Sequence, residues 1–212
     1  MSKREDVSIS VIRRLPRYYR FLGDLLKTGV YRISSKELAL RMGITASQIR
    51  QDLNCFGGFG QQGYGYNVEQ LHAEIANILG LDKKYKLILL GAGNLGRTIA
   101  TQMKFEEQGF ELIGIFDKKE SLIGEVIRGL PVRSIDTIDE FCKTYQPVTA
   151  VFCIPKNSAL EYADRLAALG IKGFWNFSHL DISIGNDDIV VENVHLGDSL
   201  MTLSYKIHDA LK

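Results

Sequence analysis

The chain contains an apolar segment, Tyr85-Lys86-Leu87-Ile88-Leu89-Leu90, followed directly by the glycine-rich run Gly91-Ala92-Gly93-Asn94-Leu95-Gly96. The apolar segment predicts a buried β-strand, and a helical pattern continues from Arg97 to Lys104. A G-x-G-x-x-G run between a strand and a helix is typical of dinucleotide-binding folds. The first glycine permits the tight turn, the second lets the backbone approach a pyrophosphate, and the third lets helix and strand pack closely. We therefore expect phosphates at the positive end of the helix, held by Gly91, Ala92, Gly93, Asn94, Leu95 and Gly96.

An acidic residue stands where such a fold needs one. The next predicted strand, Glu111–Phe116, is followed by Asp117, 21 residues after Gly96. A carboxylate about 20 positions beyond the glycine run accepts hydrogen bonds from the adenosine ribose and repels a 2′-phosphate. We expect Asp117 to favour NAD over NADP, a preference that Lys118 and Lys119 weaken. The alternative is an ordinary strand–helix turn with an exposed aspartate.

Strand and helix patterns keep alternating beyond Asp117, which predicts a doubly wound parallel sheet. The next expected elements are the strand Val148–Ile154, the helix Ser158–Leu169 and the strand Ile171–Trp175. Ligands of such sheets bind outside the carboxyl ends of the strands. Two residues at these ends, Pro155 and Asn176, are therefore predicted to contact the nicotinamide half of the cofactor. Phe177 fits this site and the core equally well.

The charge is divided unevenly along the chain. The 212 residues carry a formal net charge of +1, but residues 1–60 hold eleven Lys or Arg and five Asp or Glu, a local charge of +6. Such asymmetry indicates two parts with different roles, although a solvated helical face explains the charge alone equally well. We place a basic domain at 1–82, a nucleotide-binding domain at 83–194 and a separate C-terminal helix at 195–212.

The basic part predicts a helix-turn-helix. A helix is expected from Pro16 to the Gly29 C-cap, followed by the capping box Ser34-Ser35-Lys36-Glu37 and a helix that ends at Gly43. A second capping box, Thr45-Ala46-Ser47-Gln48, begins the next helix. Ile44 and Ile49 occupy the positions of a hydrophobic staple, and Ile49 and Leu53 form the inner face. Two short helices joined by so tight a turn are typical of DNA readers.

The outer face of the second helix carries small and hydrogen-bonding side chains that suit base edges and phosphates. With the residues at the two helix starts, the predicted DNA-binding set is Ser34, Ser35, Thr45, Ala46, Ser47, Gln48, Arg50, Gln51 and Asn54. The glycine-aromatic run 56–66 then predicts two short strands and a turn at Gln61, Gln62 and Gly63. Together these elements predict a winged helix. The alternative is a structural helical hairpin with a flexible loop.

The last segment, Asp198–Leu211, predicts an amphipathic helix with an apolar stripe of Leu200, Leu203, Ile207 and Leu211. This stripe packs either on the chain's own sheet or on a second subunit. DNA readers of this type are usually two-fold dimers on palindromic half-sites, which favours a homodimer.

Taken together, Arg50-Gln51-Asp52-Leu53, the glycine-aromatic run, the glycine loop and Phe116-Asp117 resemble the Rex family of redox-sensing transcriptional repressors, over nearly the whole chain. The resemblance implies a homodimer with a domain-swapped C-terminal helix. It also implies a repressor that NADH releases from operator DNA and that NAD⁺ permits to bind. By resemblance, Arg50 and Gln51 read the major groove, and Gln61, Gln62 and Gly63 form the wing tip.

The chain departs from this family at several positions. Relatives often carry Lys in place of Gln51 and basic residues in place of Gln61 and Gln62. Gln102 aligns with a tyrosine expected near the nicotinamide. His195 aligns with an acidic residue thought to pair with an N-terminal arginine, which is Arg20 in this chain.

Other classes of protein fit the sequence less well. A small NAD-dependent dehydrogenase needs an acid or base in a recognisable catalytic context, and none of the four histidines has one. A CoA-binding module uses a similar glycine loop, but Asp117 favours a ribose diol. The three cysteines show neither zinc nor disulfide spacing, so we expect no metal site. We expect no enzyme activity, no membrane span or secretory signal, and a cytoplasmic location.

Overall fold

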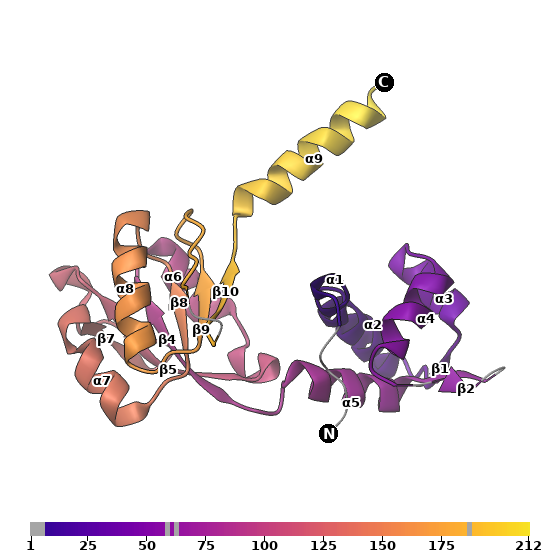
Figure 1. Ribbon diagram of the computed structural model, residues 1–212, viewed down its shortest axis with the longest axis horizontal. Helices are drawn as coiled ribbons and strands as arrows, with labels where there is room; N and C mark the ends of the chain where they lie inside the picture. Colours follow the sequence, from indigo (N-terminus) through magenta and orange to yellow (C-terminus); the bar gives the residue numbers. More distant parts are fainter. Residues whose placement is uncertain (1–6, 58–59, 62–63, 186–187) are drawn as a thin grey trace. The chain divides into compact units, whose positions relative to one another are not determined.

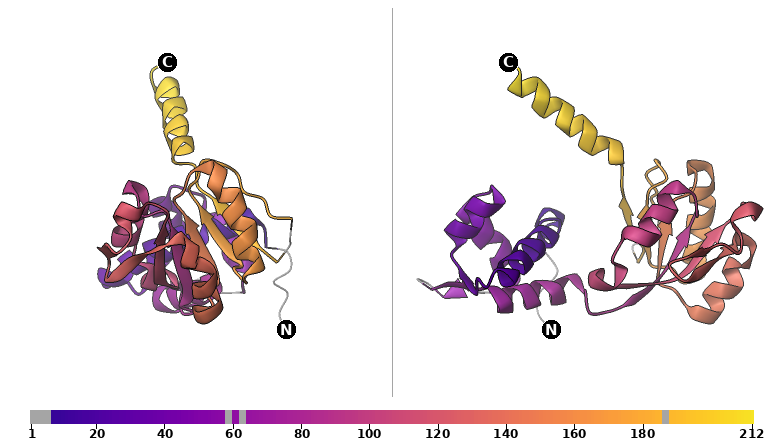
Figure 2. Two further views of the ribbon diagram at one scale, coloured as in Figure 1. Left: turned by 90° about the vertical axis from the view of Figure 1, so that its left-hand side faces the viewer. Right: turned by 180° about the vertical axis from the view of Figure 1, so that it is seen from behind.

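A computed structural model describes residues 7–57, 60–61, 64–185 and 188–212 of the chain. The chain divides into two compact units, Met1–Asp82 and Lys83–Lys212, which Figures 1 and 2 show in three views. The first unit consists of short helices and a small antiparallel sheet, and the second contains a mostly parallel sheet with helices on both faces. The predicted α/β class is confirmed.

The first unit contains five helices within the described residues: α1 (Ile9–Ile12), α2 (Leu15–Lys27), α3 (Ser35–Met42), α4 (Ala46–Asn54) and α5 (Val68–Leu79). Its strands β1 (Arg32–Ile33), β2 (Gly60–Gln61) and β3 (Gly65–Asn67) pair antiparallel in the order β1-β3-β2. The predicted helix-turn-helix and hairpin strands are confirmed. The sequence does not predict α1 and β1, because elements this short show no period.

One apolar core fixes the helix-turn-helix. The inner residues Ile49 and Leu53 of α4 are at most 1% exposed, as predicted. They belong to a cluster that draws on α2, α3, α4 and α5, including Leu15, Tyr18, Leu22, Leu38, Met42, Leu71 and Ile75. Burial of each such side chain contributes on the order of 2 kcal/mol. The orientation of α4 therefore depends on all of these helices.

The two predicted capping boxes differ in the structure. At α3 the box is complete: Ser34 Oγ accepts from the Glu37 N–H, and the Glu37 side chain accepts from the Ser34 N–H. At α4, Thr45 Oγ1 accepts from the Gln48 N–H at 3.1 Å, but the Gln48 side chain does not return the bond. The second capping box was therefore wrong in its second half, because the Gln48 amide donates to Asp52 instead.

The hairpin is held close to β1 by a glycine. Gly65 has a φ of +71°, and a Cβ at this position would lie 2.6 Å from the carbonyl oxygen of Ile33. Only glycine fits both conditions, so it permits β3 to pair with β1. The predicted turn residues Gln62 and Gly63 lie outside the described residues, and of Gln61 only the backbone is placed, in β2.

The second unit is built on a seven-stranded sheet in the order β10-β9-β8-β4-β5-β7-β6. All neighbouring strands are parallel except β6 and β7. The strands are β4 (Tyr85–Leu90), β5 (Phe110–Asp117), β6 (Val126–Ile127), β7 (Leu130–Ser134), β8 (Thr149–Phe152), β9 (Gly173–Asn176) and β10 (Val190–Asn193). The chain proceeds from β4 to β5 on one side and returns to β8 on the other, so a topological switch point lies at the carboxyl end of β4. Such a crevice is where doubly wound sheets bind ligands.

Helices cover both faces of this sheet. Ile88 and Leu90 of β4 pack with α7 (Ile138–Tyr145) and α8 (Lys156–Ala168), whereas Leu87 and Leu89 pack with α6 (Asn94–Gln102). Figure 1 shows α8 in front of the sheet, and the view from behind in Figure 2 brings α6 to the front. Single-turn helices η1 (Phe105–Gln108), η2 (Glu120–Leu122) and η3 (Ile135–Thr137) complete the unit. Helix α6 begins at Asn94 and not, as expected, at Arg97, because the glycine run itself enters the helix.

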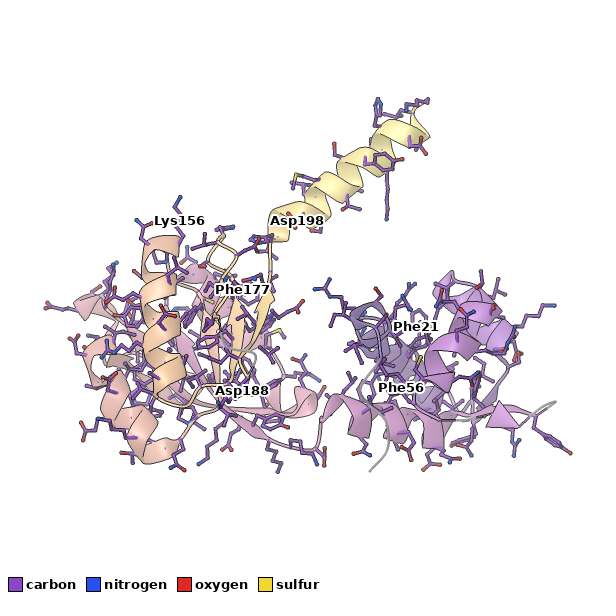
Figure 3. All side chains as sticks on the ribbon, viewed as in Figure 1. Phe21, Phe56, Lys156, Phe177, Asp188 and Asp198 are labelled. Atoms are coloured by element: carbon purple, nitrogen blue, oxygen red, sulfur yellow. The ribbon has the colours of Figure 1, made fainter. Side chains whose placement is uncertain are left out.

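The C-terminal helix α9 (Leu196–Ala210) presents its apolar stripe to solvent. Leu200, Leu203, Ile207 and Leu211 are 49–83% exposed, and Figure 3 shows side chains standing away from the helix beyond Asp198. At its start, the ring nitrogen Nε2 of His195 lies 2.8 Å from Asp181 Oδ1, and this hydrogen bond raises the pKa of His195. In the structure His195 therefore has an acidic partner within its own unit.

The described part of the chain was searched for membrane-spanning helices and for metal sites. No helix there is long and apolar enough to cross a membrane. No group of three or more potential metal ligands occurs among the described His, Cys, Asp and Glu residues. Cys55, Cys142 and Cys153 are all free thiols.

The cap of α4 gives a first test. Because Thr45 Oγ1 satisfies a first-turn N–H of α4, Thr45→Ala should lower the free energy of unfolding of the first unit by about 1 kcal/mol. Thr45→Ser keeps the oxygen and should stay near wild type. Urea denaturation followed by circular dichroism measures both. Equal stability of the alanine and serine variants would contradict this role.

Candidate functional site

The carboxyl end of β4 leads into a helix start that can accept an anion. Gly93 is the N-cap of α6, with an extended backbone (φ −68°, ψ −169°), and in the described part of the chain no side chain caps this helix. The first-turn N–H groups of a helix lack intrahelical acceptors and carry the positive end of the helix dipole. The start of α6 can therefore accept a phosphate or a carboxylate.

The three glycines of the loop are required for different reasons. Gly91 has a φ of +97°, and a Cβ there would collide with the backbone of Cys153. A Cβ at Gly96 would overlap the carbonyl oxygen of Gly91, so glycine is what lets α6 approach β4. A Cβ at Gly93 would meet open space, so a side chain at this position would occupy room in front of α6. The tight turn at Gly91 and the close packing at Gly96 agree with the roles predicted for the first and third glycines, and the predicted approach of a pyrophosphate to Gly93 stays a prediction.

Asp117 is fixed beside the glycine loop. Its Oδ2 accepts from the Ala92 N–H at 2.6 Å, and its Oδ1 accepts from the Lys119 N–H at 2.8 Å. A carboxylate oxygen can accept more than one hydrogen bond, so both oxygens keep acceptor capacity. The predicted pair of glycine loop and aspartate is thus one connected structure.

A cavity of about 570 Å³ opens at this edge of the sheet. Its lining contains four of the predicted cofactor residues, Gly91, Gly93, Asp117 and Pro155. The rest of the lining combines two lysines with apolar side chains and two aromatic rings, and consists of Phe116, Lys118, Lys119, Leu122, Ile135, Cys153, Ile154, Ser158 and Tyr162. Apolar walls with a few convergent polar groups are typical of cofactor pockets. The sequence did not single out Leu122, Ile135 or Tyr162, because their contribution depends on the packing of three separate segments.

Not every predicted cofactor residue reaches the cavity. Asn94 and Leu95 lie exposed in the first turn of α6. Asn176 is 1% exposed, and its Nδ2 donates to the Leu180 carbonyl and to Asn193 Oδ1. The Asn176 amide therefore holds the segment after β9 together. Phe177, labelled in Figure 3, is 8% exposed and packs edge-on against Trp175 in the core.

Cys153 lies in the cavity wall but is not a reactive thiol. Burial raises its pKa to about 12. Thiolates are the reactive form of cysteine, and at neutral pH almost none would be present. Cys153 therefore lines the cavity with a protonated thiol.

The outer face of α4 largely matches the prediction. Ser47, Arg50, Gln51 and Asn54 are exposed. Ala46 and Gln48 were expected on the same face, but both are half-buried, because Ala46 packs on the core and Gln48 bonds to Asp52. The exposed reading face is thus narrower than predicted.

The predicted residues at the helix starts have local partners. Ser34 Oγ and Thr45 Oγ1 cap α3 and α4. Arg50 Nη1 donates to Ser35 Oγ at 3.1 Å, which links the middle of α4 to the first turn of α3. This bond holds the Arg50 guanidinium on the exposed side of the helix-turn-helix.

A buried carboxylate under α4 was not predicted as a site. Asp52 is 1% exposed, and Arg14, Tyr18 and Gln48 all donate to it. Burial acts to raise the pKa of Asp52, but these hydrogen bonds outweigh burial and lower the pKa below its ordinary value. Burial, together with the bond to Asp52, raises the pKa of Tyr18. Asp52 is therefore ionised at neutral pH, and Tyr18 is not.

Two family models match separate parts of the chain. Residues 6–54 match the family described as "Putative DNA-binding protein N-terminus", and residues 82–180 match the family described as "CoA binding domain". The first match covers the helix-turn-helix, and the second covers the glycine loop and most of the parallel sheet. The division agrees with that between the two structural units.

Full-length relatives share one name. The chain is 56% identical over 209 residues to the redox-sensing transcriptional repressor Rex of Caldanaerobacter subterraneus subsp. tengcongensis, covering 99% of this chain and 93% of the relative. It is 55% identical to the Rex protein of Clostridioides difficile, with 95% of each chain covered.

A solved structure also matches along nearly the whole length. The crystal structure of RSP in complex with β-NAD⁺ and operator DNA has 53% sequence identity and a TM-score of 0.91, covering 98% of this chain and 95% of that chain. RSP in complex with β-NADH matches with 51% identity and a TM-score of 0.89, covering 96% and 95%.

The glycine loop provides a paired test. Gly96→Ala places a methyl group against the Gly91 carbonyl, so we expect it to destabilise the second unit by about 1–3 kcal/mol, the usual cost of overpacking. Gly93→Ala adds the same methyl group in open space and should leave the stability of this unit nearly unchanged. Thermal melts of both variants make the comparison. A Gly96→Ala protein as stable as Gly93→Ala would contradict the close approach of α6 to β4.

Proposed function

Because the chain belongs to the Rex family of redox-sensing transcriptional repressors, we propose that it binds operator DNA through its first unit and is released when NADH occupies its second. The observation that carries this proposal is the presence, in one chain, of an exposed helix-turn-helix face and an uncapped glycine-loop helix beside Asp117. Its relative RSP was crystallised with operator DNA and NAD⁺ and separately with NADH.

The DNA contacts that we propose come from α4, its preceding turn and the wing. Helix-turn-helix proteins place the second helix in the major groove, and a wing contacts the neighbouring backbone. Side chains that reach base edges are those left exposed on α4, namely Ser47, Arg50, Gln51 and Asn54. Gln61, Gln62 and Gly63 are proposed for the wing tip.

The cofactor contacts that we propose lie along the carboxyl edge of the sheet. The pyrophosphate would lie in front of Gly93 at the start of α6, and the adenosine ribose would bond to Asp117. The ring of Tyr162 and the side chains of Leu122 and Ile135 give the cavity apolar walls that suit an adenine. The open space at Gly93 and the acceptor capacity of Asp117 support the fit of NAD(H).

Pro155, the N-cap residue of α8, also lines this cavity. NADH and NAD⁺ differ by a hydride and a positive charge at the nicotinamide ring, so discrimination depends on the residues around that ring. Pro155 and the segment after β9 are proposed for this part of the site. Gln102 is the last residue of α6, where the family resemblance implies a tyrosine near the nicotinamide, so we propose that this contact differs in the present chain.

The assembly that we propose is a homodimer in which α9 packs on a second copy. The apolar stripe of α9, from Leu200 to Leu211, is exposed in the single chain and needs a partner to be buried. A two-fold dimer presents two α4 helices to palindromic half-sites. We place this regulator in the cytoplasm, where it has access to DNA and to the NAD(H) pool.

The two other candidate functions are not favoured. The named relatives are transcriptional repressors and not dehydrogenases. The "CoA binding domain" match includes the glycine loop, but RSP, which matches along nearly the whole chain, was crystallised with NAD⁺ and with NADH.

The central test is operator binding at different redox states. Fluorescence anisotropy with a labelled palindromic operator should show tight binding with NAD⁺ and at least tenfold weaker binding with saturating NADH. Gly93→Ala should abolish the response to NADH, because its methyl group occupies the space proposed for the pyrophosphate. Identical binding curves with NADH and NAD⁺ would refute the proposed function.

The glutamine at position 51 gives a second test through salt. Each protein cation that neutralises a DNA phosphate steepens the slope of log K against log salt concentration by about 0.9. If Gln51 faces the DNA, Gln51→Lys should steepen the slope by about this amount and tighten binding at low salt. Gln70→Lys adds the same charge to an exposed position of α5 and should change the slope less. Equal slopes for the two variants would contradict the placement of Gln51 against DNA.

A further inference from the structure

The carboxylate of Asp52 accepts four hydrogen bonds beneath the reading helix. Arg14 donates twice, from Nε to Oδ2 at 2.6 Å and from Nη2 to Oδ1 at 2.7 Å. Tyr18 Oη donates to Oδ2 at 2.8 Å, and Gln48 Nε2 donates to Oδ1 at 2.8 Å. A two-pronged arginine–carboxylate pair fixes direction as well as distance, because both bonds must be satisfied together.

These bonds connect different parts of the first unit. Arg14 is the N-cap residue of α2, and Tyr18 lies in the first turns of that helix, whereas Asp52 and Gln48 lie one turn apart on α4. Tyr18 and Asp52 are almost completely buried, so water cannot replace a lost bond easily. Leaving a buried charged group without one of its partners is costly. The position of α4 relative to α2 is thus fixed by polar bonds in addition to the apolar core.

Gln48 takes part in this network and not in the exposed face. Its side-chain amide is bonded to Asp52 in a partly buried setting, and its backbone N–H is held by Thr45 Oγ1. By contrast, its neighbours Ser47 and Gln51 on the same helix are exposed. A glutamine on a recognition helix is ordinarily interpreted as an adenine reader. In this structure the Gln48 amide instead donates a hydrogen bond to Asp52.

We propose that Arg14, Tyr18 and Gln48, through their hydrogen bonds to Asp52, position α4 on the operator. Gln48 is therefore a positioning residue and not a base reader. The proposal rests on the DNA-binding function proposed above. Hydrogen bonds weaken steeply with small changes of distance and angle. A shift of α4 would therefore weaken all its base contacts together, whereas loss of one reader affects the base pair that it contacts.

The test compares Tyr18→Phe and Gln48→Ala on a panel of operators with single base-pair substitutions. Each variant should lose about tenfold in affinity for the intact operator, with discrimination reduced at every base pair and with affinity for a scrambled duplex unchanged. The double variant should lose less than the product of the two single losses, because both act on one network. Arg14→Lys keeps the charge but cannot form the two-pronged pair, and it should show the same pattern.

Matched controls separate positioning from reading. Tyr19→Phe removes the neighbouring hydroxyl of α2, which has no hydrogen bond within the described residues, and should bind as wild type does. Gln51→Ala should change discrimination at one or two base pairs only. Thermal melts show that each variant is folded; if Tyr18→Phe does not fold, Gln48→Ala and Arg14→Lys provide the same comparison.

Two outcomes would overturn the inference. One is loss of discrimination at a single base pair in Gln48→Ala, the signature of a direct reader. The other is wild-type binding by the folded Tyr18→Phe or Arg14→Lys protein. If the wild-type protein does not distinguish operator from scrambled DNA, the proposed function fails instead, so the two failures are distinguishable.

Discussion

Helix α6 lies so close to strand β4 that a methyl group at Gly96 would overlap the carbonyl oxygen of Gly91. This approach brings the uncapped start of α6 to the switch point of the sheet, where β5 and β8 diverge from β4. The same loop supplies the Ala92 N–H that fixes Asp117. The uncapped start of α6, the position of Asp117 and the cavity lined by Gly93 and Asp117 therefore depend on one contact between backbones.

In the first unit, the buried carboxylate of Asp52 helps to position helix α4. Helix α4 is short, and apolar packing of Ile49 and Leu53 fixes which of its faces is buried. Packing alone directs a helix less sharply than hydrogen bonds, which require a set distance and angle. Asp52 adds such bonds to α2, and Arg50 adds one to α3. A glycine contact in one unit and a buried carboxylate in the other thus give each binding surface a defined geometry.

Sequence patterns predicted the features that repeat locally. The glycine loop and the Ser34 capping box are recognised from spacings of a few residues, and Asp117 from its distance of 21 residues after Gly96. All three are present in the structure. Asp52 could not be predicted, because its partners Arg14 and Tyr18 are 38 and 34 residues away along the chain. The same network explains two differences from the prediction. The Gln48 side chain does not complete the second capping box, and it is half-buried and not on the exposed face of α4, because its amide donates to Asp52. Asn176 was predicted to contact the nicotinamide only because it stands at the end of a strand. A strand end does not show which partners a side chain has, and here the Asn176 amide donates to Leu180 and Asn193.

The proposed function couples the binding free energies of the two units. If NADH weakens operator binding by some factor, operator DNA must weaken NADH binding by the same factor. A tenfold factor corresponds to about 1.4 kcal/mol. The most direct measurement is a titration of NADH into the protein with and without saturating operator duplex, followed by cofactor fluorescence. The proposed coupling predicts that the operator raises the dissociation constant of NADH by the factor found for operator release, and that a scrambled duplex does not. An NADH affinity that is the same with and without operator would contradict it.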